Sequence, residues 1–335
     1  MKGCIIGGTG TLSTPITNIL INNENIDCTL INRGKSLEKI DASKVTLWKT
    51  DINDKKKMMD YLENASFDVV INFINYHPDE VKRDIRYFKD KTKQYIFIST
   101  NVVLNHHEHC EISENTEIGN RISAYGQNKA ACEKVLRDTK DFPYTIVRPS
   151  HTYSDDRFPV SIKGKNTWTV FERIAGGKEI IVQDHGQSIW PITHADDFAR
   201  LFVSLVGNEK ALYETYHIMN PKPLTWDMIY QEIARQTKGT YRPVYIPTSI
   251  LEKSEKYNFK EAIAGDKAFS NIFNIDKILS LNPNFEFEVD LKEGVKRFLS
   301  YMDSNPSLKN EDSDFNVWSD ETIKNYKNLI SNFIL

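Results

Sequence analysis

The chain has 335 residues, of which 40% are hydrophobic and 27% charged, a composition typical of soluble globular proteins. Its 43 basic and 46 acidic residues leave a net charge of −3, which argues against nucleic-acid and membrane partners. No apolar run reaches the roughly 18–20 residues that span a bilayer, no secretory leader is visible, and the four cysteines form no CxxC pair. We therefore expect a cytoplasmic protein with reduced cysteines.

Short apolar runs alternate with helical patterns over the first half of the chain. The expected strands are 3–6, 28–31, 45–48, 68–73, 94–99 and 144–147, and the expected helices are 11–21, 55–63, 79–88 and 124–138. Apolar strands separated by helices indicate a parallel sheet that is covered on both faces. The pattern predicts an α/β fold with a doubly wound parallel sheet (Rossmann), which binds ligands at the carboxyl ends of its strands.

The alternation of strands and helices becomes less regular after about residue 153. Helices are expected at 168–175 and at 226–237, the second with Thr225 as its N-cap, and a strand is expected at 179–182. A polar stretch at 305–313 precedes a last expected helix at 320–333. We predict a dinucleotide-binding domain over 1–155 with a returning segment near 186–215. A smaller, mixed C-terminal substrate lobe over 156–305 and a linker with a C-terminal helix over 306–335 complete the predicted organisation.

A glycine-rich segment, Gly7-Gly8-Thr9-Gly10, lies where the first strand should turn into the first helix. Glycines at 7 and 10 permit a tight turn and let a pyrophosphate approach the N–H groups of a helix N-terminus. The third glycine position of the pattern holds Ser13, which is small enough for the helix to pack closely on the strand. We expect a dinucleotide to contact Gly7, Gly10, Thr11 and Leu12.

The second expected strand ends in Asn32-Arg33-Gly34-Lys35, with two bases and no acid. An acid at this point holds the ribose 2′-hydroxyl of NAD, whereas an Arg accommodates the 2′-phosphate of NADP, so NADP is favoured over NAD. A solvent-facing Arg is the alternative interpretation. Asp51 suits a contact with the adenine amino group, or alternatively the N-cap of the next helix. The remaining expected contacts to NAD(P) are Asn32, Arg33, Asp51, Ile52, Phe73 and Lys129.

Tyr125 and Lys129 are four residues apart and therefore project from one face of a helix. The pKa of a free tyrosine is about 10, and a neighbouring ammonium is expected to lower it. Tyr125 could then exchange a proton with a substrate hydroxyl. A third hydroxyl is expected at the end of the preceding strand, where Thr100 stands. The three residues in this chain order predict a catalytic set.

With these landmarks the chain resembles the extended short-chain dehydrogenases/reductases, in the NAD(P)-dependent sugar epimerase/dehydratase family. The resemblance covers roughly residues 3–300. It rests on 7–10, 51–52, 97–100, 125–129, 147–149, 193–197 and 291–298. It implies a nicotinamide cofactor, catalytic roles for Thr100, Tyr125 and Lys129, and usually a nucleotide-sugar substrate, often in a homodimer.

The sequence departs from this family on the substrate side. Dehydratases have Asp-Glu where this chain has Asn101-Val102, which argues against a 4,6-dehydratase. Ile189 stands at the position of a diphosphate-binding Arg, so either another base (Arg157, Lys163 or Lys165) replaces it or the substrate is not an ordinary nucleotide sugar. Substrate contacts are expected from Asn75, Asn101, His151 and Trp190, although for His151 a purely structural role is weighed equally.

The segment His106-His107-Glu108-His109-Cys110 has the composition of a metal site but not its spacing, and no metal is predicted. The sequence therefore predicts NAD(P)-dependent hydride chemistry on the hydroxyl of a sugar or nucleotide sugar. An epimerase is favoured over a single-direction ketoreductase or dehydrogenase. The alternative of another class is a non-catalytic or RNA-associated member, because some relatives with an Asn-Arg-Gly strand end bind nucleic acid.

Overall fold

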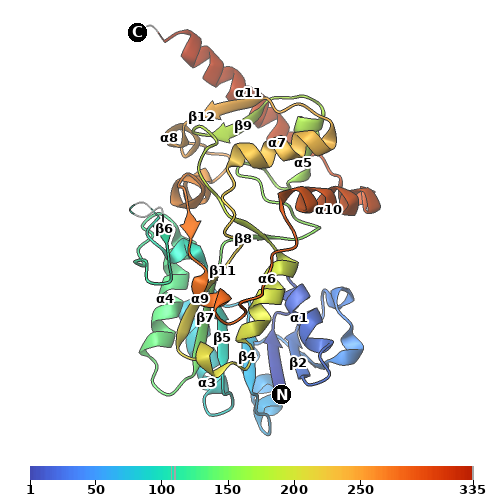
Figure 1. Cartoon of the computed structure of the whole chain (residues 1–335), viewed down its shortest axis with the longest axis vertical. Coiled ribbons are helices and arrows are strands. Elements are labelled where there is room, and N and C mark those ends of the chain that lie inside the picture. The colour runs from blue at the N-terminus through green and yellow to red at the C-terminus, as the bar shows by residue number, and fades with distance from the viewer. Residues whose placement is uncertain (107, 109–110, 334–335) are drawn as a thin grey trace.

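A computed structural model of the chain describes residues 1–106, 108 and 111–333. Seven strands form one sheet in the order β11-β7-β5-β4-β1-β2-β3, and every neighbouring pair is parallel (Figure 1). The doubly wound parallel sheet predicted from the sequence is confirmed. The strands are β1 (Lys2–Ile6), β2 (Asp27–Asn32), β3 (Thr46–Lys49), β4 (Val69–Asn72), β5 (Tyr95–Ile98), β7 (Tyr144–Pro149) and β11 (Glu214–Ile218).

Helices cover both faces of this sheet because alternate strand residues point to opposite sides. Ile5 and Ile71 belong to the core that contains α1 (Ser13–Ile21) and α6 (Ala195–Phe202). Their neighbours Ile6 and Val70 belong to the opposite core. That core is closed by α2 (Lys55–Leu62), α3 (Pro78–Phe88) and α4 (Ala124–Asp138). The continuous apolar runs of the strands thus fill two cores at once.

A second lobe, in the upper part of Figure 1, has its own core of buried aromatic and aliphatic side chains that includes Trp190 and Trp226. The chain enters this lobe after β7 and returns to the sheet through α6 and β11. Two parallel strand pairs lie outside the main sheet in this half of the chain, β8 (His151–Tyr153) with β10 (Ile192–His194) and β9 (Ile180–Gln183) with β12 (Pro243–Ile246). Its helices include α5 (Trp168–Ala175), α7 (Trp226–Thr237), α8 (Thr248–Leu251), the π-helix η6 (Lys260–Lys267) and α10 (Leu291–Ser304).

Three helices, α4, α5 and α7, have the bounds that the sequence predicted. Thr225 caps α7 as expected, because its side chain accepts a hydrogen bond from the Met228 N–H at 3.2 Å. The last helix differs from its prediction. α11 (Ser313–Ser331) begins seven residues earlier than the expected 320, since the Asp312 carboxylate caps it by accepting from the Phe315 N–H at 3.1 Å.

Smaller elements complete the described chain, and none of its helices is both long and apolar enough to cross a membrane. The short strand β6 (Glu111–Ile112) pairs in parallel with β13 (Ile272–Phe273). The remaining elements are α9 (Asp276–Leu279), η1 (Leu37–Lys39), η2 (Ala42–Lys44), η3 (Asn101–Val103), η4 (Val203–Leu205), η5 (Glu209–Ala211) and η7 (Pro306–Leu308).

A buried ion pair joins β7 to α4 behind the strand ends. Arg148 donates to the Glu133 carboxylate through Nε at 2.9 Å and through Nη2 at 2.7 Å, and Ser99 donates to the same carboxylate at 2.6 Å. Both charged side chains are at most 1% exposed. Burial by itself raises the pKa of Glu133, but the hydrogen bonds and charge of Arg148 outweigh it and hold the pKa below its usual value.

We expect Arg148→Met to lower the free energy of unfolding by about 3–5 kcal/mol, because it leaves a buried carboxylate without its main partner. The loss should shrink as the pH falls through the folded-state pKa of Glu133, where the carboxylate becomes protonated in the wild type too. Urea denaturation from pH 8 down to about pH 3 measures both effects. Lys134→Met, which removes an exposed partner of Asp138 on the same helix, is the control and should cost less than about 0.5 kcal/mol.

Candidate active site

The glycine-rich segment lies at the carboxyl end of β1, where the sheet opens between its two helical layers. Gly7 has φ of 78°, and a Cβ there would lie 2.3 Å from Ile74 Cγ2. Ser13 closes the turn, since its hydroxyl accepts from the Gly10 N–H at 2.7 Å and donates to the Gly7 carbonyl at 2.8 Å. Ser13 therefore ties the turn by hydrogen bonds in addition to being small.

Two adjoining hollows meet at Gly7, Gly10, Ile74 and Tyr76. We call the first the Tyr125 pocket, and it is lined on the sheet side by residues that follow β1, β4, β5 and β7. It contains the expected cofactor residues Thr11, Leu12, Phe73 and Lys129. We call the second the Arg33 groove, and it contains the expected residues Asn32, Arg33, Asp51 and Ile52.

The Arg33 groove has an exposed basic rim. Arg33 and Lys35 are both exposed and border the groove. Asn32 shapes the turn between them and the glycine segment, because it accepts from the Gly34 N–H at 2.7 Å and donates to the Thr9 hydroxyl at 3.0 Å. Asp51 is not the cap of α2, since that position belongs to Asp54. The structure therefore leaves the exposed Asp51 carboxylate at the groove wall.

Tyr125 stands in the first turn of α4 and lines the pocket named after it. Ser123 caps the helix by accepting from the Gly126 N–H at 3.1 Å. A Cβ at Gly126 would lie 2.4 Å from the Val102 carbonyl oxygen, so glycine is what lets the helix approach the chain just after Thr100. Tyr125 and Thr100 line the same pocket, and the Thr100 side chain acts to lower the pKa of the Tyr125 phenol.

Lys129 is 2% exposed and is held at the ends of two strands. Its ammonium donates to the carbonyls of Asn75 and Ile98, both at 2.7 Å. The Nζ atom also lies 4.7 Å from the ring centre of Tyr76 and 6.0 Å from that of Tyr125. Burial lowers the pKa of Lys129 to about 8.

The expected lowering of the tyrosine pKa by Lys129 is not found. Desolvation, followed by the neighbouring Tyr76 phenol, raises the pKa of Tyr125 to about 12. The Tyr76 and Tyr125 ring centres are 6.1 Å apart. The ammonium is turned toward the two backbone carbonyls, and at neutral pH the Tyr125 phenol therefore carries its proton in this structure.

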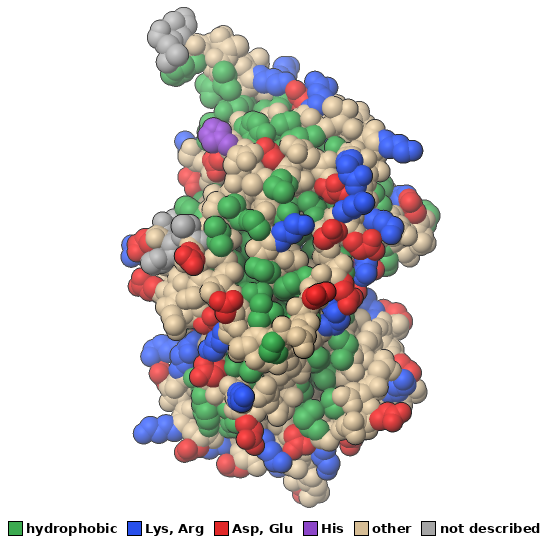
Figure 2. Space-filling model, in the orientation of Figure 1, with side chains coloured by type: hydrophobic (Ala, Val, Ile, Leu, Met, Phe, Trp, Pro, Cys, Tyr) green, Lys and Arg blue, Asp and Glu red, His purple; other side chains and the backbone are tan. Residues whose placement is uncertain are grey.

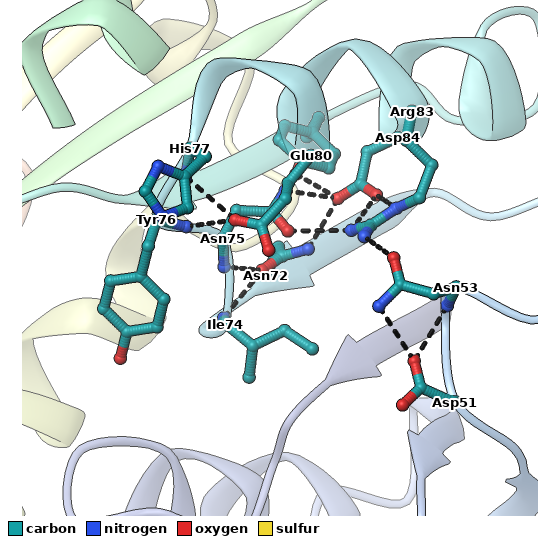
Figure 3. A network of polar contacts seen from close by, with 11 residues as sticks. Asp51, Asn53, Asn72, Ile74, Asn75, Tyr76, His77, Glu80, Arg83 and Asp84 are labelled. Carbon is teal, nitrogen blue, oxygen red and sulfur yellow. Dashed lines mark hydrogen bonds and ion pairs between the residues drawn. The ribbon is translucent and has the colours of Figure 1, made fainter. Parts of the chain in front are cut away.

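Asn75 does not have the substrate-facing side chain that the sequence suggested. Its amide is 1% exposed and is engaged by Asp84, Tyr95 and Arg83 at 2.7, 3.1 and 2.8 Å (Figure 3). The buried Asp84 and Arg83 use up the polar atoms of that side chain, so only the Asn75 backbone faces Lys129.

The other expected substrate residues do line the Tyr125 pocket. Asn101 and Trp190 are buried, and the Asn101 Nδ2 and Trp190 Nε1 atoms have no hydrogen-bond partner among the described residues. Trp190 stacks on Trp226 with ring centres 6.0 Å apart. Burial, then the charges of Lys267, Arg157 and Lys163, lower the pKa of His151 well below its usual value. His151 is therefore a neutral imidazole at physiological pH.

The three basic residues that the sequence suggested as replacements for the missing Arg lie in different surroundings. Arg157 lines the Tyr125 pocket, and with Lys163 it also lines an adjoining hollow. Lys165 lines that hollow too, but pairs with Asp314 at 3.1 Å. Ile189 is absent from the described lining of both, and its N–H donates to Ser270 at 3.0 Å.

One pocket residue, Asp266, was not predicted from the sequence. It is the one acidic side chain among the described residues that line the Tyr125 pocket, and its Oδ1 is buried without a hydrogen-bond partner in the described chain. Burial raises the pKa of Asp266 to about 7. Asp266 lies on the π-helix η6, which contacts the start of α4, because the Ala124 N–H donates to the Glu261 carboxylate at 3.1 Å. Because π-helical turns are often found at functional sites, the π-helix marks Asp266 as a candidate functional residue.

The histidine-rich segment is described only in part, because His107, His109 and Cys110 lie outside the described residues. His106 is buried, and its ring nitrogens contact the Asn271 side chain at 2.6 Å and the Asn101 carbonyl at 3.0 Å. His106 thus braces the turn that carries Asn101.

Two named relatives share sequence with the chain. The chloroplast stem-loop binding protein of 41 kDa b from Arabidopsis thaliana is 26% identical over 314 residues, which are 88% of this chain and 77% of the relative. The 2′-dehydrokanamycin reductase of Streptomyces kanamyceticus is 23% identical over 172 residues, which are 49% of this chain and 47% of the relative.

Several solved structures have the same fold. An epimerase of Methanothermobacter thermautotrophicus has a TM-score of 0.72 at 15% identity, covering 92% of this chain and 94% of its own. A UDP-glucose 4-epimerase of Thermotoga maritima, with UDP-glucose, has a TM-score of 0.68 at 19% identity, covering 91% and 100%. A dTDP-glucose 4,6-dehydratase of Bacillus anthracis, in complex with NAD, has a TM-score of 0.71 at 14% identity, covering 92% and 98%. The family model for the NAD dependent epimerase/dehydratase family matches residues 4–218, and the chain belongs to that family.

Proposed function

We propose that the protein carries out NAD(P)-dependent hydride chemistry on the hydroxyl of a sugar or nucleotide sugar, and that it is an epimerase. The observation that carries this proposal is the convergence of Thr100, Tyr125 and Lys129 on the pocket that adjoins the glycine-rich turn. The family assignment supports the cofactor, and the nucleotide-sugar epimerases among the structural neighbours support the substrate class.

The two hollows fit a dinucleotide. Gly7 and Gly10 line both hollows, so a pyrophosphate that joins the two halves of the dinucleotide would meet glycine backbone there. Asp51 stands at the wall of the Arg33 groove for the adenine, while Arg33 and Lys35 offer charge for a 2′-phosphate. Bound NAD(P) would accept the hydride from the carbinol carbon or return it. NADP is the preferred form in this proposal.

In this proposal, residues of the chain carry out the proton transfer. Tyr125 takes the hydroxyl proton during oxidation and gives it back during reduction, while Thr100, which lines the same pocket, orients the reacting oxygen. Lys129, held by two carbonyls, places a positive charge beside the ring and has one N–H left for a cofactor ribose. Buried Asn101 and Trp190 offer free donors to the sugar.

The substrate handle in this proposal is anionic. Arg157, Lys163 and Lys267 all act on the neutral His151 through their charge, so the pocket end beside this histidine is electropositive. These bases take the place of the Arg that Ile189 replaces, and a phosphate or diphosphate is the chemical group that suits them.

Two other outcomes have their own support. A reductase is supported by the relative named 2′-dehydrokanamycin reductase. A reductase would oxidise its cofactor stoichiometrically, whereas an epimerase retains it through both half-reactions. Elimination of water would need an acid, and Asp266 is the described carboxylate in the pocket, although Asn101 and Val102 argue against it. Analysis of products from nucleotide sugars with added and with co-purified cofactor separates the three reactions.

An RNA-associated role is the alternative of another class, supported by the name of the stem-loop binding relative. The slightly acidic chain and the intermixed acidic and basic side chains on the face in Figure 2 favour a small-molecule partner instead. We propose a homodimer that does not bind nucleic acid. If the purified protein bound a stem-loop RNA tightly but neither NAD nor NADP, the enzymatic proposal would be wrong.

Tyr125→Phe is expected to lower kcat by about 10²- to 10⁴-fold, because the proton donor and acceptor is lost while the ring remains. Cofactor affinity should change little. The measurement is reduced-nicotinamide absorbance during turnover, with calorimetric titration of the cofactor. Tyr213→Phe, at an exposed tyrosine beside β11, is the matched control.

The two directions of hydride transfer should depend differently on pH. The high pKa of Tyr125 keeps the phenol protonated near neutrality, so reduction should be insensitive to it, whereas oxidation needs the phenolate and should speed up with rising pH. The charge of Asp266 contributes to that high pKa, and Asp266→Asn should therefore shift the oxidation profile toward lower pH. Initial rates in both directions from pH 6 to pH 10 provide the comparison, and a shift toward higher pH would contradict this electrostatic relation.

Arg33→Ala is expected to raise the Kd for NADP by about tenfold, the effect of losing one exposed charge–phosphate contact, and to leave the Kd for NAD nearly unchanged. Fluorescence titration with both dinucleotides measures the ratio. Equal losses for both would mean that Arg33 shapes the groove without reading the 2′-phosphate.

A further inference from the structure

The loop after β4 is held by a buried polar network that the proposed reaction does not use (Figure 3). At its centre is Asp84 on α3, which is fully buried. One carboxylate oxygen, Oδ2, accepts from Asn72 at 2.5 Å, from Asn75 at 2.7 Å and from the Tyr95 hydroxyl at 2.6 Å. A carboxylate with this many donors is fixed in its orientation and fixes its donors in turn.

Arg83 neutralises this carboxylate and extends the network. Its guanidinium donates to Asp84 Oδ1 through Nε at 3.0 Å and through Nη2 at 2.8 Å. The Nη2 atom also reaches the Asn75 side-chain oxygen at 2.8 Å, and Nη1 reaches Asn53 at 2.6 Å. Asn53 in turn donates to Asp51 at the Arg33 groove. Desolvation raises the pKa of Asp84, and the charge of Arg83 opposes that rise.

The network is connected to Lys129 by hydrogen bonds through one backbone carbonyl group. Asn72 Oδ1 accepts from the Ile74 and Asn75 N–H groups at 2.7 and 3.0 Å, which folds the loop into a tight turn. The Asn75 carbonyl then accepts from Lys129 Nζ at 2.7 Å. The next residue, Tyr76, places its ring 4.7 Å from the same nitrogen. The loop therefore supplies one of the two carbonyls that hold Lys129 and an aromatic face beside it.

We propose that the buried Arg83–Asp84 pair is the positioning element of Lys129, acting through the Asn75 carbonyl. The inference rests on the proposed function in one respect, namely that Lys129 is catalytic. Asp84 lines neither hollow, and Arg83 borders the Arg33 groove but not the Tyr125 pocket, so the effect of the pair on Lys129 passes through the loop that it holds in place. Lys129 has two carbonyl acceptors, and without a fixed Asn75 carbonyl the Ile98 carbonyl alone retains it.

The test is the exposure of Lys129 in the cofactor-free protein, read by competitive reductive methylation and mass spectrometry. In the wild type, buried Lys129 should be methylated far more slowly than exposed Lys134 on the same helix. Asp84→Asn places an amide N–H₂ among donors that need an acceptor, and it should raise the Lys129 rate by about tenfold or more relative to Lys134.

The matched control is Asp227→Asn in the second lobe. Asp227 is also buried and accepts from Gln187 at 2.7 Å and from the Tyr245 hydroxyl at 2.8 Å. This variant should leave the Lys129 rate within about twofold of the wild type, because a general loss of stability is not enough to expose one lysine. Thermal denaturation of all variants identifies those that fold.

A folded Asp84→Asn protein with the wild-type methylation rate would overturn the proposal. If Asp84→Asn does not fold, Tyr95→Phe removes one donor to the same carboxylate, and an unchanged Lys129 rate in that variant would overturn it equally. Because the readout needs no turnover, absence of activity in the wild type would refute the proposed function and leave this inference to be decided by labelling. In an active protein, Asp84→Asn should lower kcat at least about tenfold with little change in the substrate KM.

Discussion

The arrangement of this site depends on the burial of one ammonium group between two strand ends. Lys129 is almost fully buried, and it is stabilised there because the carbonyls of Asn75 and Ile98 point at it from the ends of β4 and β5. The parallel sheet brings those ends to one edge, and α4 carries the lysine across it. The same helix fixes Tyr125 next to Thr100, which Gly126 permits by its lack of a side chain.

The pocket that contains this charge is lined by groups of different polarity. The charges of Lys267, Arg157 and Lys163 add to burial in lowering the pKa of His151, and Tyr125 and Tyr76 contribute two phenol rings 6.1 Å apart. Asp266 lies on the pocket wall, and its Oδ1 has no hydrogen-bond partner among the described residues. The π-helix that carries it contacts the start of α4 through Glu261. The proposed substrate, a sugar with an anionic handle, would use these donors, acceptors and charges together.

The family relationship is consistent with both an enzyme and a nucleic-acid binder, since a relative of each kind shares sequence with the chain. Physical features of the site favour the enzyme. Buried donors without partners, as at Asn101 and Trp190, carry a cost that a bound ligand removes. A surface that binds RNA through phosphates would instead need an excess of basic residues, and the chain has slightly more acids than bases.

The sequence by itself determined the alternation of strands and helices along the chain, the glycine-rich turn and the Tyr125–Lys129 pair, because these depend on local periodicity and on spacing along one helix. Only the tertiary structure decided what surrounds them. Asn75 proved to be a loop anchor because Asp84 and Arg83 hold its side chain, and Asp266 reaches the pocket from a position 141 residues further along the chain than Tyr125. Contacts between segments so far apart leave no local pattern, and the direction of a pKa shift follows from burial, which periodicity does not report.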